Sequence, residues 1–253
     1  MAAVPFNEIL RELMQAQVHN SNLLQFGSLV SARQYLRAYD LVRRYVPPGR
    51  RVLDWGAGNG HFSYFLIRSG YRVTGFDFFG TPAICAPFEP THYTYQLATT
   101  SDPVALPFED AAFDAVVSIG VLEHVREHGG DEAASLREIA RLLRPGGVFV
   151  CFHLPNRYSW IEFLLRRLGR WSHTYRFTAA QIRTLCAGAG LEPLQIRRYA
   201  LLPRNIWWWK LRRLVRDETR LAHWYDRADS FLGVLVSPIC QNYLFVARRP
   251  ELP

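Results

Sequence analysis

The sequence predicts an α/β fold in which helices cover both faces of a mainly parallel sheet. Between residues 50 and 155, short apolar segments alternate with longer amphipathic ones, which is the pattern of parallel strands joined by crossover helices. The first apolar segment runs directly into a glycine-rich turn, residues 56–60. The chain has 253 residues, of which 49% are hydrophobic and 14% aromatic. We therefore expect a substantial core and no general disorder.

Two helices are expected before the sheet begins. The first covers Phe6–Val18, and the second covers Ser31–Tyr45. The sequence Pro47-Pro48-Gly49 then ends the second helix, because proline cannot continue one. We assign residues 1–46 to an N-terminal helical cap and residues 47–200 to the core.

Strands and helices alternate through the core. A helix is expected over residues 61–69, another over Asp131–Leu143, and a third between its cap Thr178 and Gly188. Residues 78–90 contain three prolines and are expected to be irregular. The expected strands are residues 51–54, 71–76, 93–98, 113–118, 147–153, 192–199 and 242–248.

A long insertion, residues 201–240, separates the last two expected strands and leaves residues 241–253 as the final strand and tail. Connections longer than about 12–15 residues are usually functional. The insertion mixes aromatic and basic side chains: Trp207, Trp208, Trp209, Trp224, Tyr225, Arg204, Lys210, Arg212, Arg213, Arg216, Arg220 and Arg227. It is either an amphipathic helix folded over the sheet, with its tryptophans in the core, or a lid that contacts a phosphorylated or lipid-linked substrate or a membrane surface.

The glycine turn predicts the ligand. Asp54 precedes it, and the glycines follow the spacing G-x-G-x-G, so that His61 stands where a dinucleotide-binding fingerprint requires glycine. Alternate glycines let a ligand approach the main chain closely. A carboxylate at this turn would repel a pyrophosphate, but it suits a ligand with an ammonium group. S-adenosylmethionine (SAM) carries both an α-amino group and a sulfonium centre.

Four further segments with recognisable motifs follow the glycine turn along the chain. They are the strand 71–76 with Asp77 at its end, the segment Asp-Pro-Val-Ala-Leu-Pro-Phe at 102–108, the segment 113–125 with its Leu-Glu-His-Val ending, and Arg-Pro-Gly-Gly at 144–147. With the turn, they make the chain similar to class I SAM-dependent methyltransferases of the group that includes the ubiquinone and menaquinone methyltransferases. The resemblance covers residues 33–200. It implies a Rossmann-like sheet of seven strands, the last of them antiparallel, and SAM as the cofactor.

The resemblance also implies which residues hold the cofactor. Asp77 would bind both ribose hydroxyls, Phe78 would cover the adenine, and Asp102 would accept from the adenine amino group. The loop with His124 would line the methionine end. The full implied set is Asp54, Gly56, Ala57, Gly58, Gly60, Asp77, Phe78, Asp102, Ser118, Gly120 and His124.

Two histidines are candidate catalytic residues. A hydroxyl acceptor must lose a proton on methylation, and His153 ends the fifth expected strand, at the edge where open α/β sheets bind ligands. A structural role for His153 is equally open, and His124 is the second candidate. His173 and Tyr175 are weaker candidates. We expect methylation, with O-methylation favoured, of a small molecule or of a lipid- or glycan-linked acceptor; the alternative is an inert scaffold of the same fold.

Other functional classes fit less well. A net charge of +8 permits nucleic-acid binding without requiring it. The Asn/Asp-Pro-Pro-aromatic element typical of enzymes that methylate base amino groups is replaced by Ser118-Ile-Gly-Val121, so this pattern argues against a nucleic-acid partner. His124-Val-Arg-Glu-His128 fits an inverted zinc-protease motif, but Gly129-Gly130 would interrupt the helix that this motif needs.

Cysteine usage and the apolar stretches bear on metal binding, secretion and membrane insertion. Four scattered cysteines suggest neither a disulfide framework nor a zinc site, and we predict no metal. The first 14 residues are charged and lack the apolar run of a signal peptide. The apolar stretch Phe231–Ala247 is too interrupted to span a bilayer. We expect a cytoplasmic protein, with peripheral contact to the inner membrane face through residues 201–240; the oligomeric state stays open.

Overall fold

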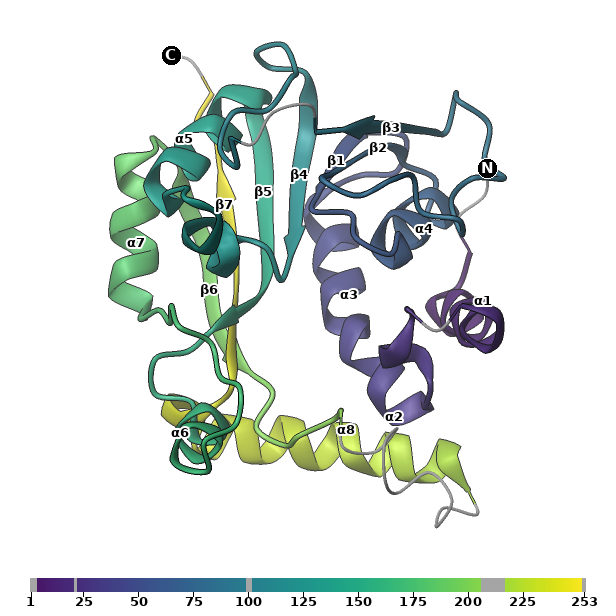
Figure 1. Ribbon diagram of the computed structural model, residues 1–253, viewed down its shortest axis with the longest axis vertical. Coiled ribbons are helices and arrows are strands. Elements are labelled where there is room, and N and C mark those ends of the chain that lie inside the picture. Colours follow the sequence, from purple (N-terminus) through teal and green to yellow (C-terminus); the bar gives the residue numbers. More distant parts are fainter. Residues whose placement is uncertain (1–3, 21, 99–101, 206–216, 252–253) are drawn as a thin grey trace.

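Seven strands form one sheet in the order β3-β2-β1-β4-β5-β7-β6 (Figure 1). The computed structural model describes residues 4–20, 22–98, 102–205 and 217–251. The strands are β1 (Arg51–Trp55), β2 (Arg72–Asp77), β3 (Tyr93–Leu97), β4 (Phe113–Ile119), β5 (Leu143–Pro155), β6 (Glu192–Tyr199) and β7 (Asn242–Arg248). β7 pairs antiparallel with β5 and β6, whereas the other pairs are parallel. The predicted fold class is confirmed.

Helices cover both faces of this sheet. They are α1 (Phe6–His19), α2 (Leu29–Ala32), α3 (Leu36–Tyr45), α4 (His61–Arg68), α5 (Glu132–Leu142), α6 (Trp160–Arg167), α7 (Ala179–Gly188) and α8 (Glu218–Leu235). α1, α3 and α4 pack on one face, and α5 and α7 pack on the other (Figure 1). None of the described helices is long and apolar enough to cross a membrane.

The central strand β5 is apolar on both sides because both of its faces are buried. Val150 and Phe152 belong to the core beneath α1, α3 and α4. Phe149 and Cys151 belong to the core beneath α5 and α7. This is the alternation expected of a strand with period two, and it explains why a buried cysteine occurs there.

The expected helix over residues 31–45 is wrong in its boundaries. The segment begins at Leu29, where the Ser28 hydroxyl accepts from the backbone N–H of Ser31 at 3.2 Å. A 3-10 turn over Arg33–Tyr35 then separates α2 from α3. Periodicity cannot distinguish one helix from two segments that continue each other through a tighter turn. The irregular connection after Asp77 is confirmed, since residues 78–92 contain neither helix nor strand.

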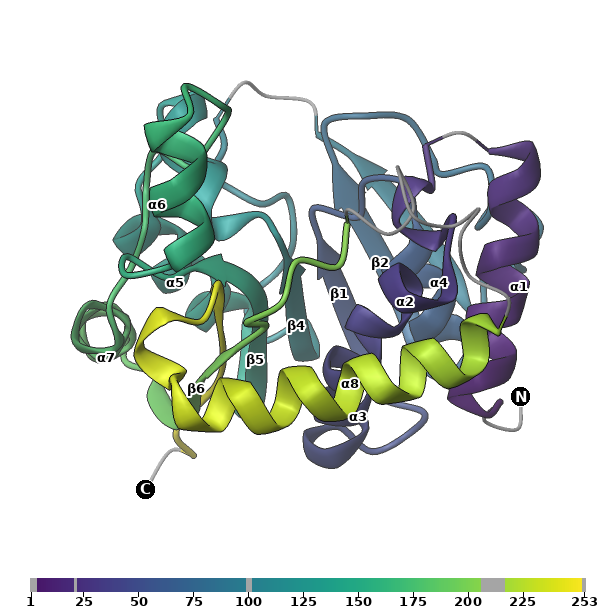
Figure 2. The ribbon, with the colours of Figure 1, turned by 90° about the horizontal axis from the view of Figure 1, so that it is seen from below.

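The described part of the insertion is largely the helix α8. It crosses the molecule at the end where the parallel strands finish, and it packs beside α2 (Figure 2). Tyr225 is buried there, whereas Trp224 is 63% exposed. The alternative in which the tryptophans of the insertion lie in the core is therefore wrong for Trp224. Trp207, Trp208 and Trp209, with Lys210, Arg212, Arg213 and Arg216, lie outside the described residues.

Candidate active site

The glycine turn combines tight packing with one open position. Gly56, Gly58 and Gly60 have φ values of 77°, 50° and 77°, in the left-handed region that favours glycine. A Cβ at Gly56 would lie 2.2 Å from Val121, and one at Gly60 would lie 2.4 Å from Pro82. At Gly58 the nearest atom would be 3.9 Å away. Gly58 is therefore the position at which a ligand can approach the main chain.

Asp77 lies directly against this turn. Its Oδ2 accepts from the backbone N–H of Gly58 at 2.7 Å, and its Oδ1 accepts from that of Phe78 at 2.6 Å. Neighbouring parallel strands carry the two features, because β1 leads into the turn and β2 ends at Asp77. Each carboxylate oxygen keeps a lone pair for a further donor. The Asp77 carboxylate can therefore bind a ribose, and the open main chain at Gly58 can contact the adjoining part of the ligand.

The other implied cofactor residues are placed less directly. Asp54 is 1% exposed and accepts from the Ser63 hydroxyl at 2.6 Å, and burial raises its pKa to about 7. Ser118 is fully buried in β4. Phe78 is 46% exposed, and Asp102 accepts from the backbone N–H of Val104 at 2.8 Å. The contacts of these residues with SAM stay predictions, and for Asp54 and Ser118 the ligand would have to reach a buried side chain.

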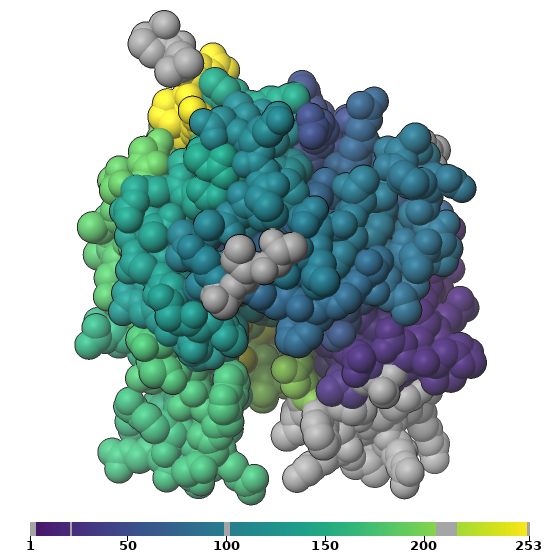
Figure 3. Space-filling view, turned by 45° about the horizontal axis from the view of Figure 1, so that its top comes forward, coloured from purple at the N-terminus to yellow at the C-terminus, as the bar shows by residue number. Residues whose placement is uncertain are grey.

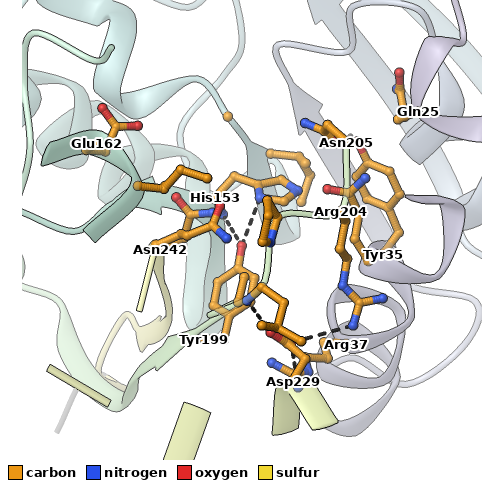
Figure 4. Close-up of a pocket in the computed structure, with 18 of the residues that line it drawn as sticks. Gln25, Tyr35, Arg37, His153, Glu162, Tyr199, Arg204, Asn205, Asp229 and Asn242 are labelled. Carbon is orange, nitrogen blue, oxygen red and sulfur yellow. Dashed lines mark hydrogen bonds and ion pairs between the residues drawn. The ribbon is translucent and has the colours of Figure 1, made fainter. Parts of the chain in front are cut away.

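A cavity of about 880 Å³ lies beside the turn, at the carboxyl end of the parallel strands (Figure 4). Among the predicted site residues its lining includes Gly120, His124 and His153. The glycine turn, Asp77, Phe78 and Asp102 do not line it. His61, the first residue of α4, is part of the lining and directly follows the turn. We call the turn with Asp77 the cofactor end and the cavity the acceptor end, after the roles that the sequence predicts for them.

His153 is held by Tyr199 at the cavity wall (Figure 4). Its backbone N–H donates to the Tyr199 hydroxyl at 2.9 Å, and its Nδ1 lies 2.9 Å from the same oxygen. The backbone has a φ of 68°, which is uncommon for a residue with a side chain. Burial, followed by the charges of His61 and His173, lowers the pKa of His153 to about 3. The ring is therefore neutral at pH 7 and only weakly basic.

A second group of titratable side chains surrounds His124. Nδ1 of His124 lies 2.9 Å from a Glu127 oxygen, and Nδ1 of His173 lies 2.8 Å from a Glu162 oxygen. The two imidazole rings are 5.7 Å apart. Glu123 is 3% exposed, and burial raises its pKa to about 8.

Glu123, His124 and His173 could together hold a cation, since their ligand atoms lie within 4.8 Å of one another. In such a cation site His124 would act together with His173. His128, the second histidine of the zinc-protease pattern, is exposed. The sequence prediction of no metal stays a prediction. Glu123 was detectable from the Leu-Glu-His segment, but Glu162 was not, because its place depends on how α6 folds back over the cavity.

Ion pairs join the insertion to the N-terminal cap along one side of the cavity. Asp226 binds Arg33 at 2.6 Å and Arg204 at 2.7 Å. Asp229 is 1% exposed, lies 3.5 Å from Arg204 and accepts from the backbone N–H of Leu201 at 2.8 Å. This network makes α8 and the α2 region one continuous wall. Of these residues the sequence analysis had named only Arg204, as part of the basic insertion.

Comparison with known proteins identifies the family. Residues 53–151 match the family model described as a methyltransferase domain. A ubiquinone biosynthesis O-methyltransferase of Ralstonia nicotianae is 30% identical over 225 residues, which cover 81% of this chain and 79% of that protein. The chain belongs to the class I SAM-dependent methyltransferases. Its cofactor is SAM, as the sequence predicts.

Other relatives match over a smaller share. A ubiquinone biosynthesis O-methyltransferase of Paracidovorax citrulli is 32% identical over 59% of this chain and 66% of its own length. A demethylmenaquinone methyltransferase of Corynebacterium kroppenstedtii is 39% identical over 48% of this chain and 52% of its own length. The chain thus spans between about half and two thirds of the length of several such relatives.

Solved structures share the fold of this methyltransferase. The 1,6-didemethyltoxoflavin-N1-methyltransferase of Burkholderia thailandensis, with bound S-adenosylhomocysteine, has a TM-score of 0.56 and 20% identity. It is matched over 99% of this chain and 92% of its own. The [4+2]-cyclase SpnF has a TM-score of 0.59 and 19% identity, with 85% of this chain and 81% of its own covered. The second likeness shows that this fold alone does not fix the reaction.

Proposed function

We propose that this protein transfers the methyl group of SAM to a hydroxyl oxygen of a small or lipid-linked acceptor. The observation that carries the proposal is the cavity, which adjoins the glycine turn and has histidines on its walls. A cavity of this size accommodates a drug-sized molecule. The names of the relatives, among them ubiquinone biosynthesis O-methyltransferases, support oxygen as the atom methylated.

The residues at the cofactor end bind and orient. Asp77 would bind the ribose, and the open main chain at Gly58 would take the adjoining part of the cofactor. When bound, SAM supplies a methyl group that is electrophilic without help from the protein. The protein therefore accelerates transfer mainly by holding the acceptor oxygen in line and by excluding water.

His124 is the residue we assign as the base. In its neutral form the Nδ1 proton points to the Glu127 carboxylate at 2.9 Å, which leaves Nε2 free to accept a proton. A carboxylate that orients a histidine in this way is the usual support for a general base. His124 lines the cavity, so a hydroxyl bound there lies within its reach.

His153 has a different role in this proposal. Tyr199 accepts the backbone N–H of His153, and its own hydroxyl proton then points to Nδ1. The neutral imidazole of His153 carries its proton on Nε2, and this N–H donates a hydrogen bond to an oxygen of the acceptor. With a pKa near 3, His153 is a poor base at neutral pH. It positions the acceptor while His124 takes the proton.

We also propose that residues 201–240 act as a lid and that residues 1–46 form a cap, joined by the ion pairs of Asp226 with Arg33 and of Asp229 with Arg37. Both segments contribute to the cavity wall, since Arg33 and Tyr35 of the cap and Arg204 and Asp229 of the insertion line it. An acceptor enclosed between them is shielded from water.

A screen of acceptors with radiolabelled SAM tests the proposed function. Quinone precursors and polyprenyl-linked sugars are offered separately, and the methylated atom of any product is identified by mass spectrometry and NMR. Transfer to a hydroxyl group supports the proposal, whereas transfer to carbon or nitrogen would replace O-methylation. SAM binding without turnover on any acceptor would instead favour the inert scaffold.

A further inference from the structure

The helix α6 leaves several of its apolar side chains exposed to solvent. Of its eight residues only Glu162 is buried. Phe163 is 51% exposed, Leu164 43% and Leu168 62%, and Trp171 just beyond the helix is 70% exposed. A surface helix of a globular protein normally buries its apolar stripe against the core. An apolar stripe turned outward marks a contact with something outside the chain.

The exposed charges around this stripe are positive. Arg166, Arg167 and Arg170 are all exposed. The one carboxylate between residues 157 and 176 is Glu162, and both of its oxygens bind His173, one at the ring and one at the backbone N–H. We call Phe163, Leu164, Leu168, Trp171 and these three arginines the α6 surface. It presents apolar side chains and guanidinium groups with no exposed acid among them.

The α6 surface lies at the mouth of the acceptor cavity. Leu164 and Trp171 of the α6 surface themselves line the cavity, together with Trp160 and Leu165 of the same segment. In the space-filling view the green part of the chain after β5 projects from the body as a lobe (Figure 3). A second apolar ridge, with Phe231 66% and Leu235 63% exposed on α8, occupies the same end of the molecule (Figure 1). A partner bound to the α6 surface would therefore lie next to the cavity.

We infer that the α6 surface docks on a bilayer that contains anionic phospholipid. Aromatic rings prefer the headgroup level of a membrane, leucines enter the acyl boundary, and arginines meet the phosphates. A protein partner would have to supply matching acids to these arginines, whereas an anionic bilayer supplies phosphates over its whole area. This surface goes beyond the proposed function and does not depend on the identity of the acceptor.

Vesicle sedimentation with the full chain tests the inference. Vesicles of phosphatidylcholine are compared with vesicles that also contain phosphatidylglycerol, at low and at high salt. We expect binding to the anionic vesicles only, weakened by salt because exposed charges are screened. Failure to bind anionic vesicles at low salt would overturn the inference, as would equal binding to both compositions. A dimer in sedimentation equilibrium that Phe163→Ser dissociates would also overturn it, in favour of a second copy as the partner.

Matched variants locate the contact. Phe163→Ser with Leu168→Ser should reduce vesicle affinity about tenfold or more, whereas Val18→Ser, at a 74% exposed position of α1, should leave it unchanged. Arg166→Gln with Arg167→Gln should weaken binding and flatten its salt dependence, unlike an exposed pair elsewhere, Arg11→Gln with Arg72→Gln. Equal losses in variants and controls would contradict the assignment. SAM affinity, measured by calorimetry on each variant, reports an intact fold without requiring turnover.

Discussion

At the cofactor end of the site the glycine turn and Asp77 come from two adjacent strands, β1 and β2, and touch through one hydrogen bond of 2.7 Å. The acceptor cavity is assembled differently. Its walls come from the N-terminal cap, the end of β5, α6 and the insertion, and residues as distant in the chain as Arg33 and Asp226 meet there. One end is thus local in sequence and the other is not, so substitutions at the two ends should separate cofactor binding from acceptor chemistry.

The largest expected effect is at the acceptor end. His124→Ala should lower the rate of methyl transfer by about 10²–10⁴ because it removes the assigned base. SAM affinity should stay nearly intact, since the loss is in chemistry. Turnover with saturating SAM and calorimetric titration of SAM measure the two quantities separately. His128→Ala, an exposed histidine in the same segment, is the matched control and should turn over normally. Full activity in His124→Ala would remove the base assignment.

The converse effect is expected at the cofactor end. Asp77→Ala should weaken SAM binding by about 1.5–3 kcal/mol, through the loss of charge-assisted hydrogen bonds to the ribose. Acceptor affinity should change little, because Asp77 does not line the cavity. Calorimetry with SAM and with S-adenosylhomocysteine measures the effect, and Asp40→Ala, at an exposed carboxylate of α3, provides the comparison. If Asp77→Ala binds SAM as tightly as the unaltered protein, Asp77 does not hold the ribose.

A smaller effect is expected at His153. If His153 were the base, His153→Ala would cost about 10²–10⁴ in rate. As an acceptor-positioning donor it should cost nearer tenfold, about the value of one hydrogen bond of 1.4 kcal/mol, and the loss should appear mainly in KM for the acceptor. Tyr199→Phe tests the same point, since it removes the hydroxyl that fixes the ring. The pH dependence of kcat should keep its shape in both variants. A change in that shape would return His153 to the role of base.

The contrast between the two ends also explains what sequence could predict. The strands and the order of motifs were predictable because each depends on a short stretch of sequence. Asp77 ends an apolar strand, and the glycine spacing of the turn at 56–60 differs from the dinucleotide-binding fingerprint. His153 was placed correctly at the end of β5. Its low pKa could not be predicted, because the burial that causes it comes from side chains such as Tyr199, 46 residues later.

Two further features of the acceptor end were out of reach of sequence patterns. His124 and His173 lie close together although 48 residues separate them in the chain, whereas the zinc-protease pattern pairs His124 with His128, four residues away. The helix α6 was not expected, because its eight residues are too short a stretch for helical periodicity to be recognised. Both features depend on where the chain folds back, which local spacing does not encode.

The smallest expected effect concerns Glu123 and the pH dependence of stability. Burial raises the pKa of its carboxyl to about 8 in the folded protein, whereas an unfolded glutamate titrates near 4.3. The folded state therefore holds a proton that the unfolded state has lost, and the free energy of unfolding falls as pH rises between these values. Asp54, with a pKa of about 7, contributes in the same direction, but it is already half ionised at pH 7 and therefore contributes less above that pH. Between pH 7 and 8 the unaltered protein should lose stability by about 1 kcal/mol, and Glu123→Gln, which keeps the shape without the proton equilibrium, should lose less. Urea unfolding at the two pH values measures this, with Glu109→Gln as the control at an exposed carboxylate. An equal loss in Glu123→Gln would mean that Glu123 is already ionised in the folded protein.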